Sequence, residues 1–287
     1  MTDKSKSPLP PLLALSLLPA MSLLGESAGN YVFFTIGVML SLLPEALLLG
    51  ILNALIKKPA KAQGRITRLF FAVSAVYFLA VTVYAVSELV GINGFLSQHR
   101  IGAALISVLL LLSGAYISLL SQGAQYRLSA AVLIITLSLF AAAALMAIKN
   151  GSALNLHLSS PTPADDTLKG FASGAALMTL DVYYPVSRIS VRCERLDVLK
   201  FAALKAAVLL LFTLPVIYVL GEHIHYSKMP AYDLAAFSKS VLIERFNGLY
   251  TLILTLSAAV MAALGMSTVR VCVIGIAKRK EVTNETA

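Results

Sequence analysis

The chain has no tryptophan, two cysteines and four histidines among its 287 residues, and only 13% of them are charged. Ordinary soluble proteins carry about 25% charged residues, so this chain has too few charges to cover a surface in water. Its mean hydropathy is +0.83, and several apolar runs reach the roughly 18 residues that indicate a membrane-spanning helix. We therefore expect an all-α, polytopic membrane protein with a single transmembrane domain over residues 1–287.

The same scarcity limits the chemistry that the chain can perform. All four histidines fall in polar connections, and no cysteine pair accompanies them, so we expect no metal site. No glycine-rich GxxxxGK[ST] loop for ATP is present. The basic residues are scattered between apolar runs, which argues against nucleic-acid binding. We expect neither enzymatic activity nor a cofactor.

The apolar runs predict about eight spans, of which the first and the sixth are short. They lie near residues 9–25, 30–56, 69–90, 101–120, 128–148, 171–187, 201–220 and 241–266. The first run contains prolines and no clear cleavage site, so we interpret it as a retained span. The polar stretches 149–170 and 221–240 are expected to be outside loops, and 267–287 a cytoplasmic tail.

The distribution of basic residues predicts the orientation of these spans. With both termini in the cytoplasm, 17 of the 23 lysines and arginines lie on the cytoplasmic side, as the positive-inside rule requires. Both cysteines, Cys193 and Cys272, then fall in cytoplasmic segments and are expected to be structural. Lys205, one turn inside the seventh span, is expected to snorkel to the cytoplasmic surface or else to reach toward Asp181.

Two carboxylates lie near the middle of expected spans, where a charge costs roughly 3 kcal/mol on insertion scales. Glu45 follows Pro44 in the second span, and Asp181 precedes Pro185 in the sixth. They are candidates for binding a cation, a proton or a ligand amine. The alternative is a neutral carboxyl group that is hydrogen-bonded to a neighbouring helix. Glu88, one helical turn after Tyr84 in the third span, is either a ligand contact or an interfacial residue.

Five short segments resemble the motifs of a known family in order and spacing. They are Gly123–Arg127, Asn155–Leu156, Tyr183–Pro185, Met229–Leu234 and Ile243–Leu249. Together they resemble the B subunits of spore germinant receptors, the endospore germination permeases of the amino acid–polyamine–organocation superfamily. The resemblance extends loosely over residues 30–266.

The resemblance implies a LeuT-type inverted-repeat permease fold that has lost its last two helices, in a cytoplasmic membrane or a spore inner membrane. It implies a small-molecule ligand, an amino acid being the expected one, bound near the midplane between broken first and sixth helices flanked by the third and eighth. It also implies germinant-receptor A and C subunits as partners. The candidate ligand-binding residues are Glu45, Tyr84, Glu88, Ser173, Gly174, Asp181 and Asn247.

Three functions remain open at this point. The first is a receptor subunit that senses a germinant and signals to its partner subunits. The second is a proton- or cation-coupled amino-acid transporter that uses Glu45 and Asp181 as its protonatable pair. The third is a structural or assembly subunit that has no ligand of its own.

Overall fold

The computed structural model describes residues 11, 13–15, 31–56, 64–96, 100–156, 164–176, 195–227, 230–237 and 246–284. All secondary structure in these ranges is helical, as the sequence predicts. The α-helices are α2 (Tyr31–Ile56), α3 (Gly64–Leu96), α4 (Arg100–Leu119), α5 (Gln122–Ala147), α6 (Ala164–Ala176), α9 (Arg195–Leu220), α10 (Pro230–Phe237) and α11 (Phe246–Asn284). Short 3-10 helices are η2 (Ile148–Asn150), η3 (Ala153–Leu156) and η4 (Gly221–Tyr226).

Four of the described helices are long and apolar enough to cross a membrane. Their apolar segments are Leu69–Ile92, Gln122–Asn150, Leu199–Leu220 and Leu252–Ala277. Two shorter apolar segments, Val32–Leu47 in α2 and Ala104–Leu119 in α4, coincide with two further expected spans. The protein is therefore a helical membrane protein. Eight spans remain a prediction, because most of 9–25 and the stretch 177–187 lie outside the described residues.

Several boundaries differ from those expected. Helix α5 begins at Gln122, because the side chain of Ser121 accepts a hydrogen bond from the backbone N–H of Ala124 and caps the helix. Helix α11 does not end at 266 but continues to Asn284, so that Cys272 is buried in the helix rather than placed in a tail. Its 39 residues span about 58 Å, more than the thickness of a bilayer with its headgroups.

The two stretches expected to be outside loops are partly helical. Residues 164–170 form the beginning of α6, and η4 and α10 occupy most of 221–237. Pro230 is the first residue of α10, a position at which its missing N–H costs nothing. The hydroxyl of Ser227 hydrogen-bonds the carboxylate of Asp233 in the first turn of α10. These local contacts order a segment whose composition indicates a loop.

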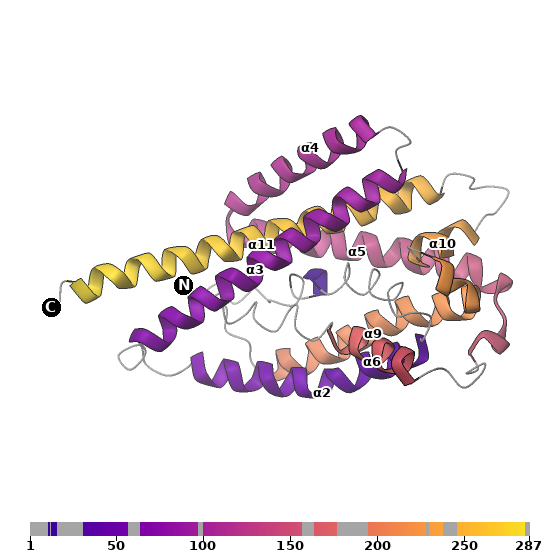
Figure 1. Cartoon of the computed structure of the whole chain (residues 1–287), viewed down its shortest axis with the longest axis horizontal. Helices are drawn as coiled ribbons and strands as arrows, with labels where there is room; N and C mark the ends of the chain where they lie inside the picture. The colour runs from indigo at the N-terminus through magenta and orange to yellow at the C-terminus, as the bar shows by residue number, and fades with distance from the viewer. Residues whose placement is uncertain are drawn as a thin grey trace.

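The helices form two groups (Figure 1). Helices α3 and α11 run side by side along the molecule, α4 packs against both, and α5 packs against α11. On the opposite side, α2 packs against both α6 and α9. Contacts between α5 and α9 join the groups. Helix α11 is the central helix of its group, because 78% of the residues in its most apolar part are buried, compared with 33% in α3.

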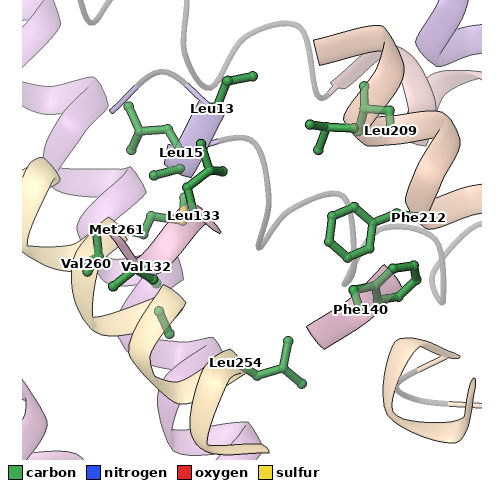
Figure 2. Packing of buried hydrophobic residues seen from close by; sticks show 14 of the residues in the cluster. Leu13, Leu15, Val132, Leu133, Phe140, Leu209, Phe212, Leu254, Val260 and Met261 are labelled. Atoms are coloured by element: carbon green, nitrogen blue, oxygen red, sulfur yellow. The ribbon is translucent and has the colours of Figure 1, made fainter. Parts of the chain in front are cut away.

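Buried apolar side chains from both groups form one core (Figure 2). The rings of Phe140 in α5 and Phe212 in α9 lie 4.1 Å apart, centroid to centroid. Leu13 and Leu15, from the first expected span, are buried in the same cluster. Residues 13–15 therefore lie in the interior of the protein and not at its surface. The rest of the expected first span, apart from residue 11, lies outside the described residues, so its retention stays a prediction.

Outside the core, one end of the molecule is held by polar contacts to the end of α9. Two groups donate to the carbonyl oxygen of Tyr218, the side-chain amide of Asn155 at 2.9 Å and the backbone N–H of Ser152 at 3.1 Å. The side chain of Asn150 donates to the carbonyl of Phe237 in α10 at 2.8 Å. These bonds satisfy carbonyl groups that a helix end leaves without partners. The connection after α5 is thereby fixed to α9 and α10.

Two glycines let α2 and α6 approach closely. The backbone carbonyl of Phe171 in α6 occupies the space where Gly37 of α2 would carry a Cβ atom. Reciprocally, a Cβ atom on Gly174 would lie 2.9 Å from the backbone nitrogen of Val38. The backbone carbonyl of Phe34 occupies that same space, so each glycine faces the residue three positions before the other glycine. Small residues are the usual means by which membrane helices approach to backbone contact.

We expect Gly37→Ala to destabilise the protein by about 1–3 kcal/mol, because the added methyl group meets backbone atoms that cannot rotate away. Gly50→Ala is the matched control on the same helix, since nothing lies within 4 Å of its Cβ position. That control should be neutral or slightly stabilising. Thermal unfolding in detergent compares the two. Equal melting temperatures for both variants would show that α2 and α6 do not cross at these glycines.

Candidate functional site

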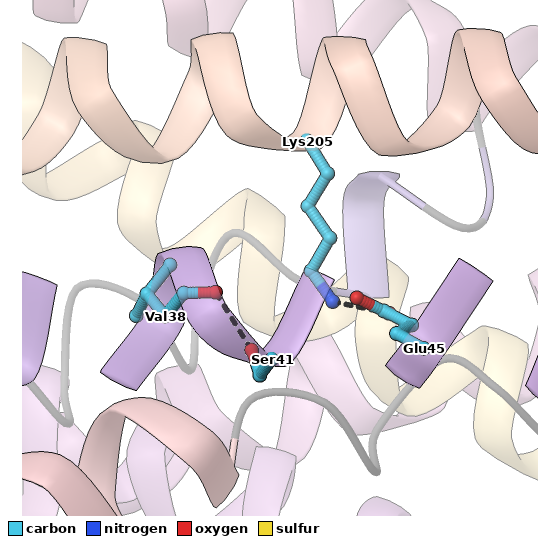
Figure 3. Close-up of polar contacts among 4 residues, drawn as sticks. All are labelled: Val38, Ser41, Glu45 and Lys205. Atoms are coloured by element: carbon cyan, nitrogen blue, oxygen red, sulfur yellow. Dashed lines mark hydrogen bonds and ion pairs between the residues drawn. The ribbon is translucent and has the colours of Figure 1, made fainter. Parts of the chain in front are cut away.

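A buried ion pair joins α2 to α9 (Figure 3). The ammonium nitrogen of Lys205 lies 2.5 Å from Oε1 of Glu45, and both residues are only 1% exposed. Glu45 lies in the apolar segment Val32–Leu47 and Lys205 in the span Leu199–Leu220. Neither charge reaches an aqueous surface in this conformation. The pair is therefore a charged site inside the apolar part of the protein.

This pair corrects the expectation for Lys205. Its side chain does not snorkel to the surface but forms an ion pair with Glu45. Asp181 lies outside the described residues, so the alternative contact with it stays a prediction. The reason is helix packing: α2 covers this face of α9 and brings a carboxylate to the lysine. A buried lysine beside a counter-charge avoids the larger cost of an unpaired ammonium group.

An aromatic ring lies beside the ion pair. The ammonium group of Lys205 lies 5.7 Å from the centroid of the Phe201 ring, one turn earlier on α9, within the range of a cation–π contact. One turn before Glu45, the hydroxyl of Ser41 donates to the carbonyl of Val38 at 2.7 Å, as Figure 3 shows. Ser41 thus satisfies its hydroxyl within its own helix.

Both helices that carry the pair contain an internal proline. Pro44 directly precedes Glu45 in α2, and Pro215 lies in the second half of α9. Proline lacks an N–H group, so neither residue can donate to the carbonyl four positions earlier, and the helix is weakened there. In α2 this weak point coincides with the charged residue. A change in the bend at Pro44 would therefore move Glu45 relative to Lys205.

The other predicted site residues occupy different positions. Gly174 is buried and Ser173 half-buried on α6, where Gly174 packs directly on α2, the helix of Glu45. Tyr84 and Glu88 are half-buried on α3, in the group of α11 and α4. Asn247 lies in the first turn of α11. The structure thus connects Glu45, Ser173 and Gly174 through α2, whereas Tyr84, Glu88 and Asn247 belong to the other group.

A network of hydrogen bonds joins α5 to α11 and contains none of the predicted ligand-binding residues. The amide nitrogen of Gln125 donates to the carbonyls of Ser118 and Leu120, at 3.1 and 3.0 Å, where α4 ends. The amide oxygen of Gln125 accepts a hydrogen bond from the hydroxyl of Ser267 at 3.0 Å. These contacts hold the α4–α5 turn against α11, so the role of Gln125 is structural. The sequence does not indicate this burial, because Gln125 lies in the connection between two expected spans, where a polar side chain ordinarily faces water.

Neither known proteins nor a metal site indicates a function for this chain. Neither the models of known protein families nor the curated proteins match this chain. Within the described ranges, no group of three or more His, Cys, Asp and Glu residues is arranged to hold a metal ion. The ion pair of α2 and α9 is the candidate site on which the functional proposal is based.

We expect Glu45→Met and Lys205→Met, each alone, to destabilise the protein by about 3–5 kcal/mol, because each removes the counter-charge of a buried group. The double variant should recover most of that loss, since an apolar pair of similar volume is often tolerated in place of a buried ion pair. Lys200→Met is the matched control, because Lys200 is exposed on the same helix.

Unfolding in detergent, measured for the four variants and the unchanged protein, gives the coupling energy between the two sites. The control should change stability by no more than about 0.5 kcal/mol. A double variant as unstable as the sum of the two single variants would mean that Glu45 and Lys205 do not interact.

Proposed function

We propose that the protein is a membrane-embedded sensor of a small molecule, an amino acid being the expected ligand, that signals to partner subunits as the B subunits of spore germinant receptors do. The observation that carries the proposal is the Glu45–Lys205 pair inside apolar helices. Ionisable residues at membrane depth are costly and generally mark ligand or ion pathways. The resemblance in sequence supplies the class of protein, and the partners would be the A and C subunits.

The arrangement of the helices supports a two-state mechanism. Helices α2, α6 and α9 are linked by the glycine crossing and by the ion pair, while α3, α4 and α11 form the other group. Proteins of permease type change state by rocking one such bundle against the other. A ligand that binds better to one arrangement shifts the population toward it, and partner subunits detect the shift. Pro44 places a flexible point beside the charged residue.

Deleting the gene in its host should remove the germination response to one or a few amino acids and leave the responses to other germinants intact. The physical reason is that one site of fixed shape and charge accepts one ligand class. Spore germination against a panel of amino acids, sugars and nucleosides is the measurement, and reintroducing the gene is the control. An unchanged profile, in a strain that carries no second receptor of the same type, would contradict the sensing role.

A coupled amino-acid transporter is the second candidate, because the same ion pair brings an acidic and a basic side chain together between apolar helices. Purified protein in proteoliposomes separates the two functions. The sensor is expected to show no net uptake and to co-purify with its A and C subunits. Proton-coupled uptake that disappears in both Glu45→Gln and Asp181→Asn would instead establish transport. Lys200→Met, exposed on α9, should leave either activity unchanged.

A further inference from the structure

The paired charges of Glu45 and Lys205 are complementary to a small molecule that carries both charges itself. An α-amino acid has an ammonium and a carboxylate group joined through one carbon atom. Placed at this site, its ammonium would face the carboxylate of Glu45 and its carboxylate would face the ammonium of Lys205. One ion pair would become two, and the net charge inside the apolar helices would remain zero.

Because the two charges of the site cancel, the site selects ligands that carry both an ammonium and a carboxylate group. An amine without a carboxylate would pair with Glu45 but leave Lys205 without its counter-charge, and an acid without an amine would leave Glu45 in the same condition. An uncompensated charge in an apolar interior is strongly unfavourable. Sites that hold buried polar groups reject ligands that leave such groups unpaired far more strongly than apolar pockets reject a missing methylene.

The neighbouring side chains favour a small ligand. Ala202 and Ala206 flank Lys205 on α9, both half-buried, and Ser41 and Ala46 lie near Glu45 on α2. The Phe201 ring also lies beside the ammonium group, so the site has an apolar wall as well as short neighbours along each helix. A ligand reaches the charges when α2 and α9 separate, and the weak point at Pro44 permits that separation next to the carboxylate.

From these observations we propose that Glu45 and Lys205 form the subsite for the charged groups of a small zwitterion, with Glu45 binding the ammonium and Lys205 the carboxylate. This assignment rests on the proposed function, because it names the ligand chemistry that the sensor would recognise. It also assigns Lys205 a role in ligand binding that the sequence does not indicate.

The test measures binding to the full-length protein in lipid nanodiscs. The ligands are the twenty standard amino acids and, for each one that binds, its decarboxylated amine and its desamino acid. The unchanged protein should bind the amino acid at least about 100-fold more tightly than either analogue. Lys205→Met should abolish the preference over the amine, and Glu45→Gln should abolish the preference over the acid. Lys200→Met is the control and should retain both preferences.

The double variant Glu45→Met/Lys205→Met keeps the test decisive if a single variant fails to fold. It retains no buried charge at this site and should fold but lose amino-acid binding. Binding retained by the folded double variant, or single variants that weaken all three ligands equally, would overturn the assignment and leave the proposed sensor intact. If the unchanged protein binds none of the twenty amino acids, the proposed amino-acid ligand fails and this assignment fails with it.

Discussion

A charged side chain in an apolar helix must find its counter-charge inside the protein, because the surrounding lipid offers none. This constraint joins α2 to α9 through Glu45 and Lys205. The cost of leaving either group alone is large, while the net gain from the intact pair over an apolar replacement is small or negative. A pair of this kind therefore adds little net stability to the fold, and its main structural effect is to fix which two helices face each other. In the proposed function, its position beside Pro44 lets the two helices separate.

Backbone packing imposes the second constraint on this group of helices. Gly37 and Gly174 place α6 against α2 at a distance that no larger residue permits. The glycine crossing joins α6 to α2, and the ion pair joins α2 to α9, so α2 has contacts with both helices of its group. Helix α11 has the corresponding role on the other side, where alanines such as Ala258 and Ala262 and the glycine Gly265 form its buried centre. Both groups therefore depend on small residues at their contacts.

The sequence predicts best those features that depend on a single segment of the chain. Helical structure and membrane character follow from composition, because apolar runs of this length have no soluble alternative. The end of α11 and the start of α5 were misplaced, since continuation of a helix past its apolar run and capping by Ser121 depend on local geometry. Glu45 stands out in the sequence because a carboxylate in an apolar span is anomalous by itself. The burial of Lys205 cannot be predicted in the same way, because a lysine near the end of a span ordinarily reaches water.

The sequence by itself determined that this protein is helical and enters a membrane, and that Glu45 needs a partner, because hydropathy and the cost of a buried charge are properties of single segments. Only the tertiary structure decided which partner Glu45 has and which glycines permit close packing. Residues 45 and 205 lie on helices far apart in the chain. Their contact depends on how α2 and α9 pack, and no local pattern along the sequence encodes that packing.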